Sequence, residues 1–257
     1  MKPLISLIIP AHNEADFLPS CLEAARQAAA RVDGTVETVV VLNRCTDATE
    51  QIARAHGCRI VREDARNLSA IRNAGVAAAS GEIIVTCDAD SRMHPESFSD
   101  ILEKLGGGKC VGGGAVVVPE RWSVGIVASA LSVLPYLVFS GVSFGLFWFS
   151  KKDFDAVGGF DTRFVSVEDV DFAQRLKAHG RLTGRGWGTL FRAALVTSCR
   201  KFDEFGDWYL FRNPAFVRRV FRGNDRQAAD RFWYDVRAGE SGSLKPRDTQ
   251  ALGSDDG

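Results

Sequence analysis

Two aspartates one residue apart follow an apolar run. The triplet Asp88-Ala89-Asp90 comes directly after residues 82–87, whose composition predicts a buried strand. Side chains alternate along a strand, so the two carboxylates point to the same side if the chain stays extended and share a tight turn if it bends. Carboxylates this close repel unless a positive charge lies between them, and a hard divalent cation is the usual solution. The triplet therefore predicts a site for a metal ion and the phosphate oxygens of a nucleotide diphosphate, although an Asp-rich surface turn has the same local pattern.

A second acidic pair, Glu168-Asp169, opens a predicted helix that runs to Gly180. Acids in a first helical turn are stabilised by the helix dipole, so a well-capped helix start is the structural alternative. Asp171 alone would serve that purpose. We therefore expect one carboxylate of the pair to anchor neighbouring backbone and the other to face a pocket.

Alternating strands and helices must position these acids. Apolar runs predict strands at residues 4–9, 38–42, 59–61 and 82–87, and helical periodicity predicts helices at 14–30, 46–56 and 68–79. This alternation favours parallel strands joined by right-handed crossovers, and ligands of such sheets bind at the carboxyl ends of the strands. The polar segments 10–14, 43–47 and 88–90 should therefore meet at one edge.

The second half of the chain is less regular. A helix should end near residue 105, and a strand at 110–118 carries three glycines that we expect to floor a sugar pocket. Residues 122–150 carry no charge, but Pro135 and several glycines and serines favour a buried or interfacial helix at 124–137, followed by a strand, over a transmembrane span. Residues 209–222 predict a cationic aromatic helix, which would either rest on anionic lipid headgroups or simply cap the domain.

Composition limits the function classes. The chain has 257 residues, 46% of them hydrophobic, which suits one α/β domain with at most a small appendage. The formal net charge is zero, so no nucleic-acid partner is expected. Six cysteines without a Cys-x-x-Cys pair indicate reduced thiols, and the short apolar run at residues 1–10 is not a signal peptide, so we expect a cytoplasmic protein.

Six sequence blocks resemble those of family 2 glycosyltransferases of the GT-A fold, in the same order and at similar spacing. They are Ser6-Leu-Ile-Ile-Pro-Ala-His-Asn-Glu14, Asn43-Arg-Cys-Thr-Asp-Ala-Thr49, Arg72-Asn-Ala-Gly75 with Ala79-Ser-Gly81, Asp88-Ala-Asp90, Gly158-Gly-Phe-Asp161 and Glu168-Asp169. The resemblance covers about residues 4–200. Each block is weak alone, but independent matches in register multiply.

The resemblance implies a fold and its limits. The expected architecture is α/β, with a Rossmann-like, mostly parallel central sheet, helices on both faces and a C-terminal helical extension. It places a GT-A domain at residues 1–200, divided into a nucleotide-binding half at about 1–92 and an acceptor half at about 93–200. The helical extension would occupy 201–240, and a disordered tail 241–257.

The resemblance also implies roles for individual residues. The base and ribose pocket would be formed by Pro10, His12, Glu14, Asn43 and Asp47, with Arg72 and Asn73 near the nucleotide. Asp88 would touch ribose or sugar, and Asp90, with Asp88 beside it, would bind Mg²⁺ or Mn²⁺. Asp169 would be the general base, with Glu168 next to it.

Together these expectations describe a metal-dependent, inverting glycosyltransferase that moves one sugar from a nucleotide-diphosphate sugar to an acceptor hydroxyl. The acceptor stays open, with lipid-linked or membrane-proximal hydroxyls among the alternatives, as does peripheral contact with an anionic membrane on its inner face. The chain lacks the Gln-x-x-Arg-Trp block of processive synthases, which favours single transfer. It also lacks the late metal-binding histidine of some relatives, and Arg200 and Lys201 could balance the diphosphate instead.

Asn43 stands where the family often has an acid, so the preference for uracil, guanine or thymine stays open. Three rival functions also remain. Nucleotidyl transfer would call for a glycine-rich phosphate loop after the first strand, which residues 11–14 do not supply. A phosphatase could use Asp88 as a nucleophile. A binding module without turnover would not need Asp90 and Asp169.

Overall fold

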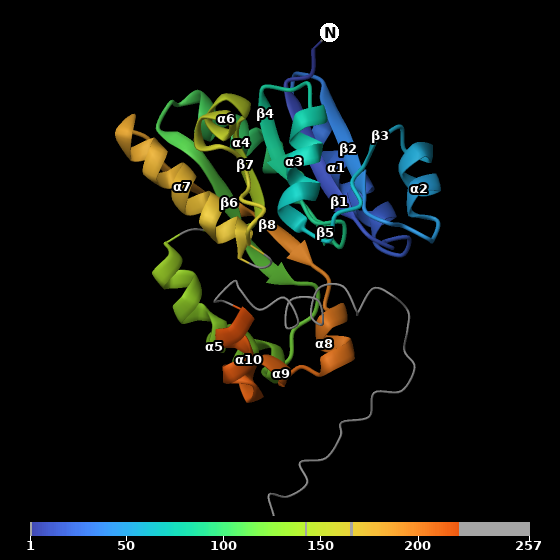
Figure 1. Ribbon diagram of the computed structural model, residues 1–257, viewed down its shortest axis with the longest axis vertical. Helices are drawn as coiled ribbons and strands as arrows, with labels where there is room; N and C mark the ends of the chain where they lie inside the picture. Colours follow the sequence, from blue (N-terminus) through green and yellow to red (C-terminus); the bar gives the residue numbers. More distant parts are fainter. Residues whose placement is uncertain (1, 142, 165–166, 221–257) are drawn as a thin grey trace, which may run out of the picture.

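A computed structural model describes residues 2–141, 143–164 and 167–220 (Figure 1). Its strands are β1 (Ile5–Ala11), β2 (Val36–Leu42), β3 (Arg59–Arg62), β4 (Ile83–Thr86), β5 (Ser91–Arg92), β6 (Cys110–Pro119), β7 (Phe144–Ser150) and β8 (Gly186–Thr197). Its helices are α1 (Leu18–Ala29), α2 (Thr49–Ala55), α3 (Leu68–Ala78), α4 (Ser97–Gly106), α5 (Val124–Ser140), α6 (Lys151–Val157), α7 (Glu168–Leu182), α8 (Arg200–Phe205), α9 (Tyr209–Arg212) and α10 (Pro214–Val220).

The described strands form one eight-stranded sheet in the order β3-β2-β1-β4-β7-β6-β8-β5. Strands β1 to β4 pair in parallel, as do β6 and β8, whereas β7 runs antiparallel between β4 and β6. The short β5 pairs antiparallel with β8 and places Ser91 opposite Thr197. The expected α/β fold with a mostly parallel sheet is therefore confirmed, and its carboxyl-terminal edge collects the ends of β1, β2 and β4.

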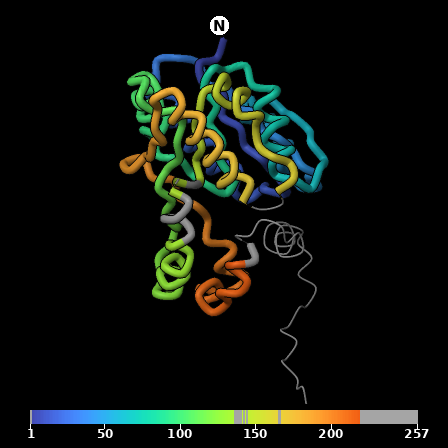
Figure 2. Tube along the Cα trace, turned by 60° about the vertical axis from the view of Figure 1, so that its left-hand side comes forward, coloured from blue at the N-terminus to red at the C-terminus, as the bar shows by residue number. Residues whose placement is uncertain are grey.

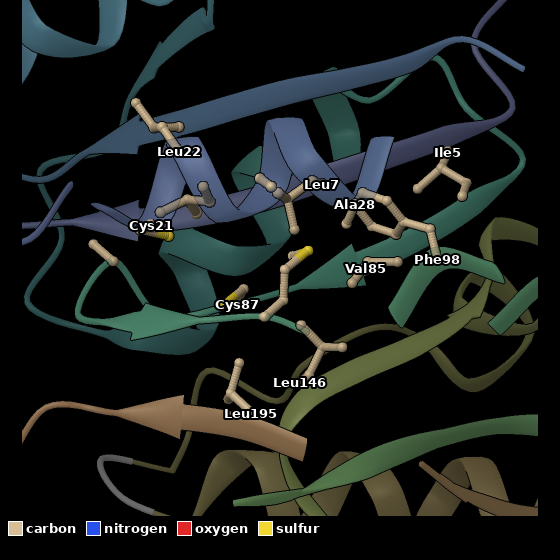
Figure 3. Packing of buried hydrophobic residues seen from close by; sticks show 14 of the residues in the cluster. Ile5, Leu7, Cys21, Leu22, Ala28, Val85, Cys87, Phe98, Leu146 and Leu195 are labelled. Atoms are coloured by element: carbon tan, nitrogen blue, oxygen red, sulfur yellow. The ribbon is translucent and has the colours of Figure 1, made fainter. Parts of the chain in front are cut away.

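Each face of the sheet has its own apolar layer. On one face, Leu7 of β1 packs in a cluster with residues of α1 and α4 such as Leu22 and Phe98 (Figure 3). On the other face, Ile8 packs in a second cluster with residues of α3, α6 and α7 such as Phe172. Successive residues of a strand point to opposite faces, so an unbroken apolar strand is what a sheet covered on both sides requires. The helices thus clamp the strands whose ends carry the acids.

The helix α5 and the C-terminal helices α8 to α10 project together beyond the end of the sheet (Figures 1 and 2). We call these four helices the helical lobe. Arg121, just before α5, forms ion pairs with Asp203 and Asp207, which lie in α8 and in the turn before α9. Ser129 of α5 donates to the carbonyl oxygen of Asp207 at 2.7 Å. The C-terminal helices are therefore anchored to α5.

Several sequence expectations need correction. The helix expected from residue 14 begins at Leu18, because residues 15–17 form a turn in which the N–H groups of Phe17 and Leu18 bond to the carbonyl of Glu14. The single helix expected at 209–222 is split into α9 and α10, since Pro214 cannot continue a helix that begins before it. Within the described residues no helix is both long enough and apolar enough to cross a bilayer. Residues 221–240 of the expected extension, and the expected tail at 241–257, lie outside the described residues.

The three glycines of β6 serve packing between strands and do not floor a pocket. A Cβ on Gly113 would lie 2.2 Å from the carbonyl oxygen of Gly188, and one on Gly114 would lie 2.5 Å from the carbonyl oxygen of Ser143. A Cβ on Gly112 would come 2.7 Å from the carbonyl oxygen of Trp148. The glycines therefore make room for β8, for β7 and for the chain that leads into β7.

Candidate functional site

Carboxylates and arginines alternate along the carboxyl-terminal edge of the sheet. The register places Ala11 of β1 beside Leu42 of β2, and Ile8 beside Thr86 of β4, so the loops that follow these strands begin at one edge. Those loops carry Glu14 and the Asp88-Ala89-Asp90 triplet. The edge predicted from the sequence is the edge that the structure forms.

Arg200 joins the first loop to the second aspartate of the triplet. Its guanidinium donates to both carboxylate oxygens of Glu14, at 2.7 and 3.0 Å, and lies 2.8 Å from Oδ2 of Asp90. Glu14 is 1% exposed, so Arg200 compensates a carboxylate that water barely reaches. The β5–β8 pairing makes the contact: Ser198, one residue past β8, donates its backbone N–H to the carbonyl of Asp90, and Arg200 follows at the start of α8.

Arg72 makes the corresponding bridge for the first aspartate. It lies on α3 with only 4% of its side chain exposed, and its Nη1 is 2.8 Å from Oε1 of Glu168. Its Nη2 lies 3.2 Å from Oδ1 of Asp88, and its guanidinium sits 5.5 Å from the ring centre of Phe160. Arg72 therefore ties the end of β4 to the first turn of α7, which is 96 residues distant from it in the sequence.

The carboxyls of Glu168 and Asp169 hold protons more tightly than ordinary acids. Burial, and next the neighbouring Asp169, raise the pKa of Glu168 to about 7, against the lowering effect of Arg72. Burial also raises the pKa of Asp169, to which the charge of Asp88 adds, again against Arg72. Glu168 is buried and held by Arg72, whereas Asp169 is partly exposed. Asp169 accepts the backbone N–H of Val170 at 2.8 Å, so the acid that contacts neighbouring backbone is Asp169, and the expectation that the other acid faces a pocket stays a prediction.

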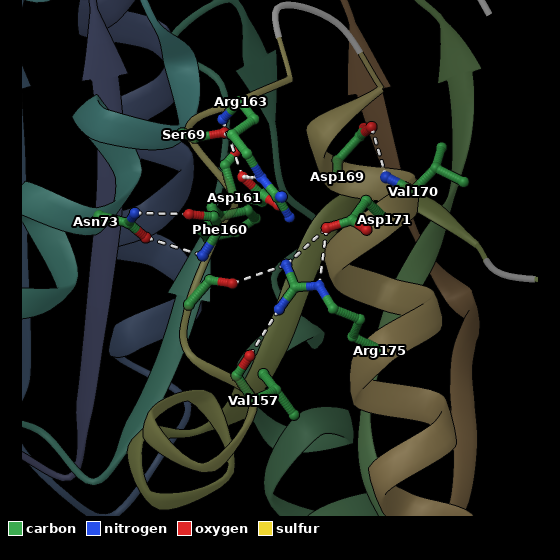
Figure 4. A network of polar contacts seen from close by, with 11 residues as sticks. Ser69, Asn73, Val157, Phe160, Asp161, Arg163, Asp169, Val170, Asp171 and Arg175 are labelled. Carbon is green, nitrogen blue, oxygen red and sulfur yellow. Dashed lines mark hydrogen bonds and ion pairs between the residues drawn. The ribbon is translucent and has the colours of Figure 1, made fainter. Parts of the chain in front are cut away.

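The segment 157–164 before α7 is fixed by hydrogen bonds from both sides (Figure 4). Asn73 of α3 donates to the carbonyl of Phe160 at 2.8 Å and accepts its N–H at 3.0 Å. Arg175 of α7 donates to the carbonyls of Val157 and Gly159. A Cβ on Gly159, whose φ is 69°, would also meet Phe154 at 2.8 Å. Asn73 thus positions this loop rather than pointing at open space, and the loop in turn supports Arg72 through Phe160.

The remaining predicted site residues lie at the end of β1 and in the loops after β1 and β2. Nδ1 of His12 donates to the carbonyl of Asn43 at 2.5 Å, and Pro10 lies within β1. The buried amide of Asn43 donates to the carbonyls of Glu63 and Ala65. Asp47 accepts from the backbone N–H groups of Ala15 and Thr49. His12 and Asp47 thus join the two loops, and Asn43 joins the second loop to the segment after β3. Contact of these residues with a nucleotide stays a prediction.

A pocket of about 230 Å³ opens beside Asp90 toward the helical lobe. Its lining joins the end of β8 to α8 and α9 and consists of Asp90, Thr197, Ser198, Lys201, Phe202, Tyr209 and Leu210. Ser198 also donates to Oδ2 of Asp90 at 3.3 Å. Nothing in the local sequence marks Ser198, Phe202 or Tyr209 as site residues, because their place beside the triplet depends on the β5–β8 pairing. Because β5 has only two residues, its sequence shows no alternation of polar and apolar residues from which the strand could be predicted.

The donor set of the triplet fits a hard divalent cation. Asp88 and Asp90 offer carboxylate oxygens, the ligand type that Mg²⁺ and Mn²⁺ prefer. The side chain of Asp88 is 43% exposed, so it can be reached by a ligand. The described residues contain no cluster of three or more His, Cys, Asp or Glu side chains that could hold a metal ion. A cation here would therefore draw most of its ligands from phosphate oxygens and water.

Comparison with known proteins identifies the family. Residues 6–157, more than half of the chain, match the family model described as Glycosyl transferase family 2. The putative glycosyltransferase EpsH of Bacillus subtilis (strain 168) is 27% identical over 109 residues, which cover 40% of this chain and 31% of EpsH. The undecaprenyl-phosphate 4-deoxy-4-formamido-L-arabinose transferase of Klebsiella pneumoniae (strain 342) is 30% identical over 108 residues, covering 39% of this chain and 33% of that protein. The aligned segments thus span about a third of these two relatives.

Two solved structures share the fold. TarS 1-349 from S. aureus aligns with a TM-score of 0.58 and 16% identity, covering 89% of this chain and 69% of TarS 1-349. Glucosyl-3-phosphoglycerate synthase from Mycobacterium tuberculosis, solved with Mn²⁺, UDP and glucosyl-3-phosphoglycerate, aligns with a TM-score of 0.57 and 21% identity, covering 84% of this chain and 78% of that one. The expected GT-A fold is therefore confirmed.

Proposed function

The chain belongs to glycosyl transferase family 2, and we propose that it transfers a single sugar, with inversion, from a nucleotide-diphosphate sugar to an acceptor hydroxyl. The observation that carries the proposal is the convergence of two bridged acid sets at one sheet edge. Glu14 and Asp90 share Arg200, while Asp88 and Glu168 share Arg72, with Asp169 next to Glu168. In this arrangement, Arg200 and the two aspartates of the triplet could bind a diphosphate and its metal ion. The carboxylate of Asp169 could contact the acceptor.

The acceptor hydroxyl attacks the anomeric carbon of the donor sugar. A bond forms between that oxygen and the anomeric carbon, and the bond from the anomeric carbon to the diphosphate oxygen breaks. The nucleoside diphosphate leaves with the electron pair. Asp169 takes the proton of the hydroxyl, because it is the accessible member of the acidic pair. Attack opposite the leaving group inverts the anomeric configuration.

The raised pKa of the acidic pair suits this role. A general base works best when its pKa lies near the operating pH, since a weaker base accepts protons poorly and a stronger one is already protonated. Burial raises the pKa of Glu168 to about 7 and that of Asp169 in the same direction. Arg72 opposes this rise and so keeps the pair able to ionise near neutral pH.

On the donor side, Asp88 and Asp90 would hold Mg²⁺ or Mn²⁺, which supplies Lewis-acid neutralisation of the charge that develops on the diphosphate. Arg200 adds a fixed guanidinium beside Asp90. The synthase from Mycobacterium tuberculosis was solved with Mn²⁺ and UDP, which supports a divalent cation and a nucleotide donor for this chain. The loops after β1 and β2, with Pro10, His12, Asn43 and Asp47, would surround the base and ribose.

Thermal denaturation with nucleotides tests the proposal. The melting temperature is measured with UDP, GDP and dTDP, each with and without Mn²⁺. At a nucleotide concentration of about 100 times Kd, binding adds about 2.7 kcal/mol. For a domain of this size that is a rise of about 5–10 °C. One of the three nucleotides should give this rise, and more strongly with Mn²⁺.

The matched pair of variants is Asp90→Ala and Asp155→Ala. Asp155 is an exposed acid on α6, away from the row, so its removal should leave the nucleotide effect unchanged. Asp90→Ala should remove the part of the shift that depends on Mn²⁺. If none of the nucleotides raises the melting temperature under either condition, the transferase proposal fails. A mass-spectrometric screen of donors on lipid and small-molecule extracts then identifies the acceptor class.

A further inference from the structure

Helix α5 exposes a stripe of large apolar residues on one face, while Gly125, Ile126 and Ser129 are buried on the other. Val124, Val127, Leu131 and Leu134 follow the i, i+3, i+7, i+10 spacing of one helix face, and their exposed fractions are 76, 41, 59 and 47%. An ordinary surface helix shows the opposite arrangement, with the apolar stripe turned toward the core. The exposed stripe of α5 is therefore available for an apolar environment outside the described residues.

The buried face of α5 explains why the stripe points outward. Ser129 is fully buried and donates to the carbonyl of Asp207. A Cβ on Gly125 would meet Cβ of Asp207 at 2.7 Å and the indole of Trp208 at 2.9 Å. Glycine and serine are thus required where α5 meets the turn before α9. Rotating the helix to bury its leucines would break this contact.

The segment that packs on the buried face of α5 carries exposed aromatic and cationic side chains. Trp122 is 65% exposed just before α5, and Trp208 and Phe211 of the neighbouring segment are 39 and 53% exposed. Arg212 lies 5.9 Å from the ring centre of Trp208, and Arg218 on α10 is exposed. Residues 208–222 hold four arginines and no acid. Exposed tryptophan and arginine side chains on a lobe that also exposes valines and leucines are typical of a membrane–water interface.

We propose that the helical lobe, through the exposed α5 stripe and the exposed side chains of Trp122, Phe211, Arg212 and Arg218, binds the surface of an anionic lipid bilayer. The positive charge favours an anionic bilayer as the ligand. The four arginines of residues 208–222, with no acid between them, complement anionic headgroups. No described helix can span a bilayer, so α5 lies in the interfacial plane with its valines and leucines among the acyl chains. The pocket beside Asp90 is lined in part by α8 and α9, so it opens toward the same lobe.

Co-sedimentation with vesicles tests the inference on the full chain. The wild type should pellet with vesicles of phosphatidylcholine containing about 30% phosphatidylglycerol, and bind pure phosphatidylcholine at least about ten-fold more weakly, with the difference shrinking in high salt. Leu131→Ser together with Leu134→Ser should weaken binding at least about 100-fold, because each leucine leaves the acyl region. Arg212→Gln and Arg218→Gln should each cost about five-fold, and only on anionic vesicles.

Leu182→Ser is the matched control. Leu182 is 86% exposed at the end of α7, outside the lobe, so its substitution should leave vesicle binding unchanged. All variants change exposed side chains and should keep the melting temperature of the wild type. Failure of the wild type to bind anionic vesicles would overturn the inference, as would an equal loss in Leu182→Ser. A wild-type dimer that the double leucine variant dissociates would assign the stripe to a second copy and overturn it as well.

Discussion

Removing the buried cation Arg72 should destabilise the fold by an amount that depends on Glu168. The two side chains are 4 and 8% exposed, and their charged atoms lie 2.8 Å apart. At an effective dielectric constant of about 20, the attraction at this distance is about 6 kcal/mol. Desolvation of both groups offsets most of it, so the intact pair contributes little net stability. Removal of one partner leaves the other charge buried and alone, which typically costs about 3–5 kcal/mol.

The perturbation is Arg72→Met, which keeps an unbranched apolar stem and removes the charged guanidinium. Urea denaturation at pH 8 should show a loss of about 3–5 kcal/mol in the free energy of unfolding. In the double variant Arg72→Met, Glu168→Gln, much of this loss should be recovered, because no uncompensated carboxylate stays buried. Arg163→Met is the control, since Arg163 pairs with Asp161 at 2.6 Å but is 87% exposed. It should cost at most about 1 kcal/mol.

The pH dependence gives the prediction a second, independent readout. The folded protein raises the pKa of Glu168 from 4.5 to about 7, and loss of Arg72, which lowers it, should raise it further. Between the unfolded and folded pKa values the native state holds more protons, so stability falls as pH rises through that window. Arg72→Met should therefore regain stability as the pH is lowered from 8 to 5. A loss below about 1 kcal/mol at pH 8, or a double variant no more stable than the single one, would refute the reasoning.

Three further predictions concern the proposed chemistry. Asp169→Asn should keep the nucleotide-induced rise in melting temperature and lower kcat about 10²–10⁴-fold, since it removes a proton acceptor without changing the shape of the side chain. Full turnover by this variant would contradict the assignment of Asp169 as the base. In the wild type, kcat/KM measured from pH 5 to 9 should be lower at the acid end, because burial raises the pKa of Asp169 and this carboxyl must lose its proton to act as the base. A kcat/KM that increases toward pH 5 would exclude this role. Arg200→Lys should lower the free energy of unfolding in urea and reduce the Mn²⁺-dependent part of the nucleotide-induced rise in melting temperature. The reason is that an ammonium cannot bind both oxygens of Glu14 and also reach Asp90 in the same geometry. A variant that behaves like the wild type would argue against a role for Arg200 in joining Glu14 to Asp90.

The local pattern of the sequence was sufficient for the layered part of the fold. Apolar runs that end in Pro10 to Glu14, in Asn43 and in Asp88 predicted parallel strands whose carboxyl ends meet, and the registers of β1, β2 and β4 agree. Side-chain alternation and helix periodicity depend only on neighbouring residues, so they can be recognised in the sequence before the tertiary structure is known. The same holds for the acidic start of α7, where Glu168 and Asp169 are adjacent in the chain.

Local patterns failed where side chains meet across long separations. Gly112 to Gly114 suggested space for a ligand, and the structure uses that space for neighbouring strands. The uncharged segment that forms α5 could not show which face it buries, because that depends on Asp207, far along the chain.

Sequence alone determined which residues carry charge and which strand ends could present it: the triplet at 88–90, the pair at 168–169 and the acid at 14. Tertiary structure alone decided their partners. Arg72 meets Glu168 across 96 residues and Arg200 meets Glu14 across 186, and neither separation leaves a trace in local periodicity. Burial also shifts the pKa of the acidic pair, and burial is a property of the whole fold.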